Sequence, residues 1–301
     1  MSKIAIISGA DSGYWHLLQG LRSSLFTNHG ALAFDFCVLD LGLSDQQLSE
    51  LMQDQTVIAR PEWDIDFPDR VSMPEHFKAM VCRPFLTKYF PGYDIYVWID
   101  ADAWIQDEHV LKIYIDAAEQ GQLSITAQVD RAYKALYKRQ KLFGWTHNHK
   151  HYRLGWGWRT ADRYGRYPIL NSGAFALARD APHWEAWQNT LREGLQRTTH
   201  PLVEQTALNL VVYRDKLNST FLPAYCNWLC DAAHPMVEEE AGNLVEPNAP
   251  HQTLGIVHLA GEFERNHDVI LKTRLGDTVE TKLQFSDWQS TRERLVLEDN
   301  S

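Results

Sequence analysis

The sequence IYVWIDAD, residues 95–102, decides the fold of this 301-residue chain. Five uncharged residues that are β-branched or aromatic run from Ile95 to Ile99, which predicts a strand buried on both faces. In an open α/β sheet ligands bind at the carboxyl ends of the strands, and residues two apart in an extended segment point the same way. We therefore expect Asp100 and Asp102 to face one hard cation, magnesium or manganese, with its other positions left for phosphate.

A second Asp-x-Asp triplet, at residues 64–66, shows that the motif by itself proves little. It lies among Pro61, Pro68 and Asp69, and no strand leads into it. Because proline and aspartate clusters mark turns, we expect this triplet to be a solvated loop. Position relative to a strand therefore separates the two triplets.

The composition predicts a globular protein of one large or two ordinary domains, with 45% hydrophobic and 12% aromatic residues for its core. A formal net charge of −10 argues against a general affinity for nucleic acid or anionic lipid. There is no run of about 18 apolar residues that would span a membrane. The first residues begin a strand and do not form a signal sequence, so a cytoplasmic location is expected.

The cysteines are scattered in apolar surroundings, which favours reduced core thiols over disulfides. No second cysteine pair stands at zinc spacing from the last two of them, so a metal is not expected there. The four are Cys37, Cys82, Cys226 and Cys230.

Strands and helices alternate over the first 130 residues, which predicts an α/β protein with a mostly parallel central sheet. The loop after the first strand holds neither a dinucleotide fingerprint nor a P-loop, so Asp11 and Ser12 are interpreted as helix caps. The expected strands cover 3–8, 33–39, 56–59, 95–99 and 123–127, and a helix is expected after the first strand and near 44–52, 76–90, 108–120 and 131–142.

The pattern changes after residue 143. Residues 144–168 combine tryptophans, tyrosines and histidines with no periodicity, which indicates a functional loop or flap whose rings suit a sugar. His147, His149 and His151 alternate there, but nothing in the pattern fixes them around a metal. Beyond this stretch we expect strands at 169–177, 220–222 and 255–261, helices at 182–196 and 202–213, a surface loop at 238–250, and a hairpin at 269–285 followed by a charged tail.

A glycine inside an apolar strand marks the close approach of a ligand or another backbone, and Gly173 follows Asn171 and Ser172 in such a strand. Arg83 lies on a helix expected behind the acidic strand end, where it is either solvated or close to a phosphate or the two aspartates. These positions add polar side chains around the first triplet.

Two further positions have both an ordinary and a functional interpretation. Glu204 and Gln205 suit the first turn of any helix. A lone histidine is usually a core residue, yet His258 at a strand end is a plausible third metal ligand beside two carboxylates.

The order of these signals resembles glycosyltransferase family 8. The resemblance covers roughly residues 3–265 and is closest in the aspartate pair, the Asn-Ser-Gly strand and the Glu-Gln helix start. The series comprises Asp11, Tyr14, Arg83, Asp100, Asp102, Asn171-Ser172-Gly173, Glu204-Gln205, Leu222-Pro223, Asn227, His258 and Gly261.

The resemblance implies a GT-A fold, with a Rossmann-like sheet flanked by helices, and a single glycosyltransferase domain over residues 1–301. Within it, residues 1–130 would form the nucleotide-binding half, 131–265 the donor-sugar and acceptor half, and 266–301 a carboxyl-terminal hairpin and tail. The donor would be a nucleotide sugar, most often UDP-linked, held by manganese or magnesium. The acceptor would be a glycan or another hydroxyl compound.

The resemblance also assigns residues. It places Glu204 and Gln205 beside the reacting carbon, with Glu204 orienting the sugar and Gln205 near its open face, and it implies retention of configuration. The implied metal ligands are Asp100, Asp102 and His258. The implied donor-binding residues are Ser8, Ala10, Asp11, Tyr14, Arg83, Asp100, Ala101, Asn171, Ser172, Gly173, Gly261 and Arg265.

One position departs from the family pattern. Where the family commonly has a lysine that meets the phosphates, this chain has Glu264, followed by Arg265. Either Arg265 takes that role with a shift of one residue, or the phosphates are held elsewhere, or the donor differs.

Two rival interpretations stay open. A phosphohydrolase like the haloacid dehalogenases also uses Asp-x-Asp, but it normally has the motif after the first strand and carries Thr or Val where this chain has Trp104. A non-catalytic protein that binds a sugar or nucleotide sugar is the second rival, because fold-level analogy does not establish activity.

Overall fold

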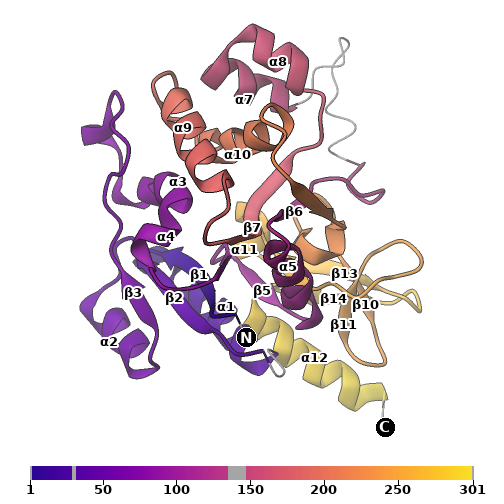
Figure 1. The fold of residues 1–301 in the computed structure, drawn as a ribbon. Helices are drawn as coiled ribbons and strands as arrows, with labels where there is room; N and C mark the ends of the chain where they lie inside the picture. The colour runs from indigo at the N-terminus through magenta and orange to yellow at the C-terminus, as the bar shows by residue number, and fades with distance from the viewer. Residues whose placement is uncertain (1, 29–31, 135–146, 300–301) are drawn as a thin grey trace.

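The computed structural model describes residues 2–28, 32–134 and 147–299 (Figure 1). Its centre is a seven-stranded sheet with the order β3-β2-β1-β4-β7-β6-β8. The helix predicted at 131–142 lies almost wholly outside the described residues. The strands are β1 (Ile4–Ala10), β2 (Asp35–Asp40), β3 (Val57–Ala59), β4 (Ile95–Ile99), β6 (Leu123–Ala127), β7 (Leu170–Ala178) and β8 (Ser219–Leu222).

All neighbouring pairs in this sheet are parallel except those of β7, which runs antiparallel to both β4 and β6. The mostly parallel sheet is therefore confirmed, with one reversed strand. In the β4–β7 register Ile99 pairs with Ala174, and the Asp100 amide donates to the Gly173 carbonyl at 2.7 Å. The reversal thus puts the start of β7 beside the end of β4, which brings Asn171, Ser172 and Gly173 to the two aspartates.

Helices cover both faces of the sheet, as strands buried along almost their whole length require. On one face Ile6 and Val97 pack with α1 (Trp15–Thr27), α2 (Asp45–Gln53) and α5 (His109–Glu119). On the other face Ile7 and Trp98 pack with α3 (Lys78–Cys82), α4 (Leu86–Tyr89), α9 (His183–Leu195) and α10 (Val203–Tyr213). β4 is buried on both sides, as its sequence predicts.

The helix predicted at 76–90 is broken into short pieces. A 3-10 turn, Arg83–Phe85, separates α3 from α4, and Pro84 lies in it because proline cannot continue a helical hydrogen-bond ladder. Two more 3-10 turns, Arg70–Ser72 and Glu75–Phe77, precede α3. The break leaves Arg83 pointing into the centre of the molecule.

The prediction of a loop at 144–168 is wrong for the described part of this range, which forms two helices, α7 (His147–Trp156) and α8 (Trp158–Tyr164). Figure 1 shows these helices beyond α9 and α10. Tyr152, Trp156 and Tyr164 are buried in the same core as α9 and α10. Packing against neighbouring helices stabilises this pair despite its weak periodicity.

Two smaller sheets complete the fold. One has the order β5-β12-β9, and the other, β11-β10-β13-β14, carries the predicted hairpin, with Val269 opposite Thr281 and Gly276 at φ +105° in the turn. Part of the predicted surface loop 238–250 pairs as β11. The strands are β5 (Ala103–Ile105), β9 (Trp228–Leu229), β12 (Ile256–His258), β10 (Met236–Glu238), β11 (Asn243–Val245), β13 (Val269–Thr273) and β14 (Thr278–Thr281).

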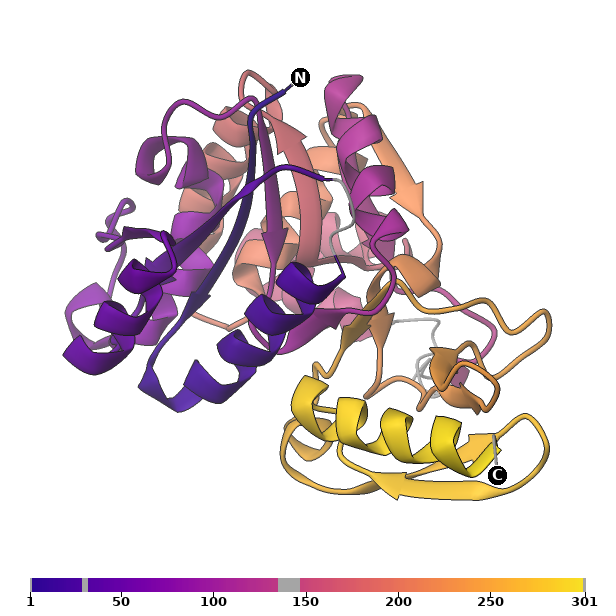
Figure 2. The same cartoon turned by 90° about the horizontal axis from the view of Figure 1, so that it is seen from below.

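The predicted charged tail is instead a helix, α12 (Phe285–Asp299). Figure 2 shows α12 lying across the hairpin, close to α1. Its first turn buries Phe285 and Trp288 in a third hydrophobic core, and burial of these aromatic rings explains why a charged sequence is held as a helix. No helix in the described part of the chain is long and apolar enough to cross a membrane.

The second Asp-x-Asp triplet is a loop, as predicted, but it is not solvated throughout. The Asp64 carboxylate is only 3% exposed and pairs with Lys88 at 2.7 Å. It also accepts a hydrogen bond from the Tyr89 hydroxyl. Ile65 is buried in the core. Two partners from α4 thus pull Asp64 inward, an arrangement that local sequence does not reveal.

Candidate functional site

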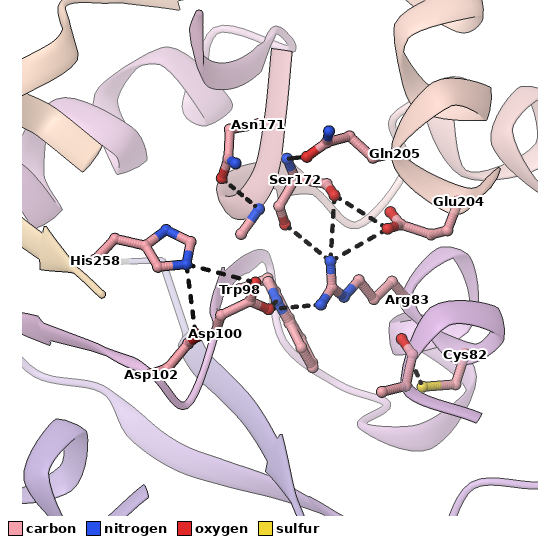
Figure 3. A network of polar contacts seen from close by, with 12 residues as sticks. Cys82, Arg83, Trp98, Asp100, Asp102, Asn171, Ser172, Glu204, Gln205 and His258 are labelled. Carbon is pink, nitrogen blue, oxygen red and sulfur yellow. Dashed lines mark hydrogen bonds and ion pairs between the residues drawn. The ribbon is translucent and has the colours of Figure 1, made fainter. Parts of the chain in front are cut away.

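Pairing of the backbone brings His258 to the end of β4. β12 pairs with β5 so that His258 stands opposite Ala103, and the Leu259 amide donates to the Asp102 carbonyl at 2.9 Å. His258 Nε2 lies 3.4 Å from Asp102 Oδ1 and 4.0 Å from Asp100 Oδ2 (Figure 3). Ligand atoms of these three residues all lie within 4.8 Å of one another. We call Asp100, Asp102 and His258 the carboxylate–histidine cluster.

A chain of two asparagines orients the imidazole of this cluster. His258 Nδ1 lies 2.9 Å from Asn227 Oδ1, so a proton on Nδ1 leaves Nε2 facing the two carboxylates. Asn227 Nδ2 donates in turn to Asn171 Oδ1 at 3.0 Å. Asn227 comes from the 3-10 turn Ala224–Asn227. Its place in the sequence is part of the family resemblance, but its contact with His258 follows only from the fold.

Gly173 leaves room for the cluster. A Cβ atom at this position would lie 2.4 Å from His258 Cε1 and 2.8 Å from Asp100 Oδ2. Both distances are shorter than van der Waals contact, so any larger residue would displace the two groups. The glycine does mark a close approach, but the groups that approach it are side chains and not the ligand or backbone that was expected.

Two arginines hold the outer oxygens of the aspartates. Arg83 Nη2 donates to Asp100 Oδ1 at 2.6 Å, and Arg265 Nη1 donates to Asp102 Oδ2 at 2.9 Å. The inner oxygens, Asp100 Oδ2 and Asp102 Oδ1, face His258. Burial by itself would raise the pKa of Asp102, but the hydrogen bond and charge of His258, together with Arg265, outweigh burial and lower that pKa to about 2.

Arg83 also joins the cluster to the amino-terminal turn of α10. Its Nη1 donates to Glu204 Oε2 at 3.2 Å and to Ser172 Oγ at the same distance. Ser172 Oγ donates to Glu204 Oε2 at 3.0 Å, and the Ser172 amide donates to Gln205 Oε1 at 3.1 Å. Figure 3 shows Ser172, Glu204 and Asp100 around the Arg83 guanidinium, with Gln205 on the backbone amide of Ser172. The solvated alternative for Arg83 is therefore wrong, since its side chain is 6% exposed.

Glu204 is a fully buried carboxyl group. Its Oε1 has no hydrogen-bond partner among the described residues. Burial raises the pKa of Glu204 to about 7, an effect that exceeds the opposing influence of Arg83 and Ser172. An unsatisfied buried oxygen of this kind is costly to the folded state.

Two cavities meet at the carboxylate–histidine cluster. The first cavity, of about 520 Å³, is lined by Asp11, Tyr14, Trp98 and Arg265 among others. The second cavity, of about 340 Å³, is lined by Asn171, Gln205, Gln128 and Asp231 among others. Both include the residues Arg83, Asp100 and Asp102. The two cavities therefore adjoin at the carboxylates of the cluster.

The structure brings most of the predicted donor-site residues to these cavities, including Ala10 and Ala101. Ser8 is different, because its side chain is fully buried in β1 and lines neither cavity. The helix-cap interpretation of Asp11 is confirmed, since its Oδ1 accepts hydrogen bonds from the Gly13 and Tyr14 amides of the 3-10 turn Ser12–Tyr14. Asp11 caps this turn and lines the first cavity at the same time.

Gly261 lines neither cavity. A Cβ atom on it would lie 2.1 Å from Glu264 Oε2. Glu264 faces His234, whose Nε2 is 3.4 Å away, whereas Arg265 on the same short helix, α11 (Glu262–Asn266), lines the first cavity. The geometry therefore favours Arg265 over Glu264 as the side chain near the cluster.

Other potential metal ligands do not form a cluster in the described residues. His149 Nε2 pairs with Asp162 at 2.9 Å, and the ring of His151 packs against that of His200. The side chain of His147 lies outside the described residues. All four cysteines are buried free thiols, as predicted.

Several residues of the cavity walls were not predicted. Met80, Pro201 and Ala260 line both cavities, and Gln128 and Asp231 line the second. Most come from loops or element ends, and a single sequence carries no local signal that such residues share a wall. Only the fold assembles them.

The chain has the GT-A fold of glycosyltransferases, with a central sheet in which β7 is reversed and an acidic pair at the end of β4. The chain is similar in structure to galactosyltransferase LgtC in complex with donor and acceptor sugar analogs, with 13% identity, a TM-score of 0.53, and coverage of 86% of this chain and 87% of that one. An active-site mutant of LgtC matches at 12% identity and a TM-score of 0.50, over 85% and 87% of the two chains.

The apo structure of the bifunctional glycosyltransferase WbbM is also similar, with 15% identity and a TM-score of 0.54. The match covers 88% of this chain and 47% of WbbM, so the chain spans about half the length of that protein. No protein-family model and no curated protein sequence matches the chain. At these identities the likeness establishes the fold, and the activity must be argued from the site.

Proposed function

We propose that this chain is a metal-dependent glycosyltransferase that moves a hexose from a UDP-sugar to a hydroxyl group of a glycan or similar acceptor. The observation that carries the proposal is the meeting of two cavities at the carboxylate–histidine cluster. A nucleotide in the first cavity and a sugar in the second would put the bond between them beside Asp100 and Asp102. The likeness to LgtC and WbbM and the resemblance to glycosyltransferase family 8 support the same class.

The residues of the cluster fit a divalent cation. Two carboxylate oxygens and an imidazole nitrogen are ligands that manganese and magnesium accept, and Asn227 fixes the imidazole with Nε2 inward. When bound, such a cation stabilises the negative charge that develops on the leaving diphosphate. Asp100, Asp102 and His258 would hold it, with manganese the expected ion.

On the nucleotide side, Tyr14 and Asp11 form part of the wall of the first cavity, and we assign them to the uracil base together with Ala10 and Ala101 of the same cavity. Arg265 lies between that wall and Asp102, within reach of a diphosphate. Since guanidinium groups bind phosphate oxygens in pairs, Arg265 replaces the lysine of the family in this assignment.

On the sugar side, the contacts of the second cavity support roles for Glu204 and Gln205. Glu204 Oε1 is buried without a partner, so a hydroxyl of the donor sugar that donates to it would satisfy it. The Gln205 carboxamide is held by the Ser172 amide at the edge of the same cavity. We assign Glu204 to orienting the sugar and Gln205 to the open face of the reacting carbon, with retention of configuration.

The test is to incubate the protein with UDP-hexoses and manganese and to measure the released UDP. Transfer or slow donor hydrolysis supports the proposal. Release of inorganic phosphate instead would support a phosphohydrolase, and saturable binding without turnover would support a non-catalytic binding protein. Asp102→Ala should abolish UDP release, because it removes one carboxylate of the cluster.

A thermal-shift panel of nucleotide sugars, with and without manganese, would identify the donor. A ligand that binds only the folded state raises the apparent stability by mass action. The shift should depend on manganese for the true donor and should be lost in Asp102→Ala.

A further inference from the structure

We propose that Arg265 couples metal binding to nucleotide binding: without ligands its guanidinium holds Asp102, and the diphosphate of the donor draws it away. Each ligand then strengthens the binding of the other. This inference rests on the proposed function, since it takes a divalent cation and a nucleoside diphosphate as the ligands of the first cavity. It concerns the order and interdependence of their binding.

The position of Arg265 carries the argument. Its Nη1 donates to Asp102 Oδ2 at 2.9 Å and to the Ala260 carbonyl at 2.8 Å. The guanidinium carbon lies 5.6 Å from the centre of the Tyr14 ring. The side chain therefore lies between the wall assigned to the base and the cluster assigned to the metal, which is the path that a diphosphate would take.

Arg83 provides a contrast within the same site. Its two terminal nitrogens donate to Asp100, Glu204 and Ser172, and its side chain is 6% exposed. Both hydrogen bonds of Arg265 come from Nη1, and its side chain is 18% exposed. Arg83 is thus locked into the fold, whereas Arg265 can exchange one acceptor for another without leaving a buried charge unpaired.

Charge gives the direction of the coupling. A cation at the inner oxygen of Asp102, Oδ1, would lie across the carboxylate from the guanidinium on Oδ2 and would be repelled by its positive charge. A diphosphate offers Arg265 paired acceptor oxygens and reduces that repulsion. Because linkage is reciprocal, the factor by which UDP improves manganese binding equals the factor by which manganese improves UDP binding.

The experiment measures the affinity for manganese alone and for manganese at saturating UDP, with correction for the manganese–UDP complex in solution. Electron paramagnetic resonance of the free ion reports binding without any turnover. In Arg265→Gln the positive charge that repels the ion is gone, so manganese alone should bind roughly three- to tenfold more tightly than to the wild type. The improvement caused by UDP should fall by a similar factor.

Two variants serve as controls. Arg265→Lys keeps the positive charge, so its affinity for manganese alone should stay closer to the wild type than that of Arg265→Gln. Arg274→Gln removes an exposed arginine in the turn between β13 and β14 and should change neither affinity. Thermal unfolding of each variant establishes that it is folded.

The outcomes separate the coupling from the proposed function. Wild type that binds manganese and UDP, with Arg265→Gln binding manganese alone no more tightly, overturns the coupling and leaves the function standing. Wild type that binds neither ligand overturns both. Tighter manganese binding in Arg265→Gln together with a reduced effect of UDP supports the coupling.

Discussion

The two Asp-x-Asp triplets in this chain differ in how their carboxylates are arranged. The carboxylates of Asp100 and Asp102 converge on His258, whereas those of Asp64 and Asp66 separate. Asp64 turns inward to Lys88 and Tyr89, and Asp66 is 88% exposed and pairs with Arg70 at 3.2 Å. The same three-letter pattern therefore yields a candidate metal site in one place and a loop anchor in the other.

The chain around each triplet accounts for the difference. The first triplet ends a strand, and its aspartates are met by β12 and by the start of β7, which come from much later in the sequence. Its middle residue, Ala101, is small and lines a cavity. In the second triplet no strand precedes the acids, and the middle residue, Ile65, is drawn into the core. Convergence thus depends on what other segments bring to the acids.

The largest expected effect directly tests the difference between the two triplets. Asp102→Ala should lower manganese-dependent transfer by about 1,000-fold or more, because the cation that stabilises the leaving group loses a ligand. The measurement is kcat/KM for UDP release at saturating manganese. Asp66→Ala is the matched control, and its kcat/KM should equal that of the wild type. Unchanged turnover in Asp102→Ala would remove the distinction between the triplets.

Glu204 is buried beside the first triplet and shares Arg83 with Asp100. Its burial should appear in the pH dependence of stability. An unfolded glutamate has a pKa of 4.5, and Glu204 in the fold has a pKa of about 7, so the folded state binds its proton more tightly. Stability should therefore fall as the pH rises from about 4.5 to 7, by about 3 kcal/mol in total from this residue. Glu204→Gln cannot ionise and should lack this contribution.

Urea unfolding at several pH values measures this difference. The free energy of unfolding of Glu204→Gln minus that of the wild type should increase as the pH rises through that window and level off above it. A difference that stays constant from pH 4.5 to 8 would contradict the raised pKa of Glu204.

A smaller effect is expected at Asn227, which contacts His258 but is not itself a proposed metal ligand. Asn227→Ala removes the oxygen that orients His258 and should weaken manganese binding by about 10- to 100-fold. Asn189→Ala, at an exposed position of α9, is the control and should bind manganese as the wild type does. Equal affinities in the two variants would mean that the cluster holds its geometry without Asn227.

The smallest effects concern the stability contributed by the second triplet. Asp64→Ala should lower the free energy of unfolding by about 1–3 kcal/mol, because the Tyr89 hydroxyl and Lys88 lose a buried acceptor. Asp66→Ala should change it by no more than about 0.5 kcal/mol, because its ion pair is exposed. Chemical denaturation measures both. Equal stabilities would show that Asp64 does not anchor the loop.

The sequence by itself determined the elements with strong local patterns. The buried strand β4, the alternation of strands and helices, the β13–β14 hairpin and the close approach at Gly173 follow from periodicity and residue type. The order of the motifs resembles glycosyltransferase family 8, and that resemblance implies the GT-A fold. The strand, the alternation and the hairpin can be predicted from sequence because each depends on residues near one another in the chain.

The tertiary structure alone decided how these elements meet. The reversal of β7 places Asn171 to Gly173 beside the aspartates, and pairing of β12 with β5 delivers His258. Packing also turned an aperiodic stretch into α7 and α8 and directed Arg265, and not Glu264, into the first cavity. These outcomes depend on contacts between segments far apart in the chain, whose free energies no local pattern records.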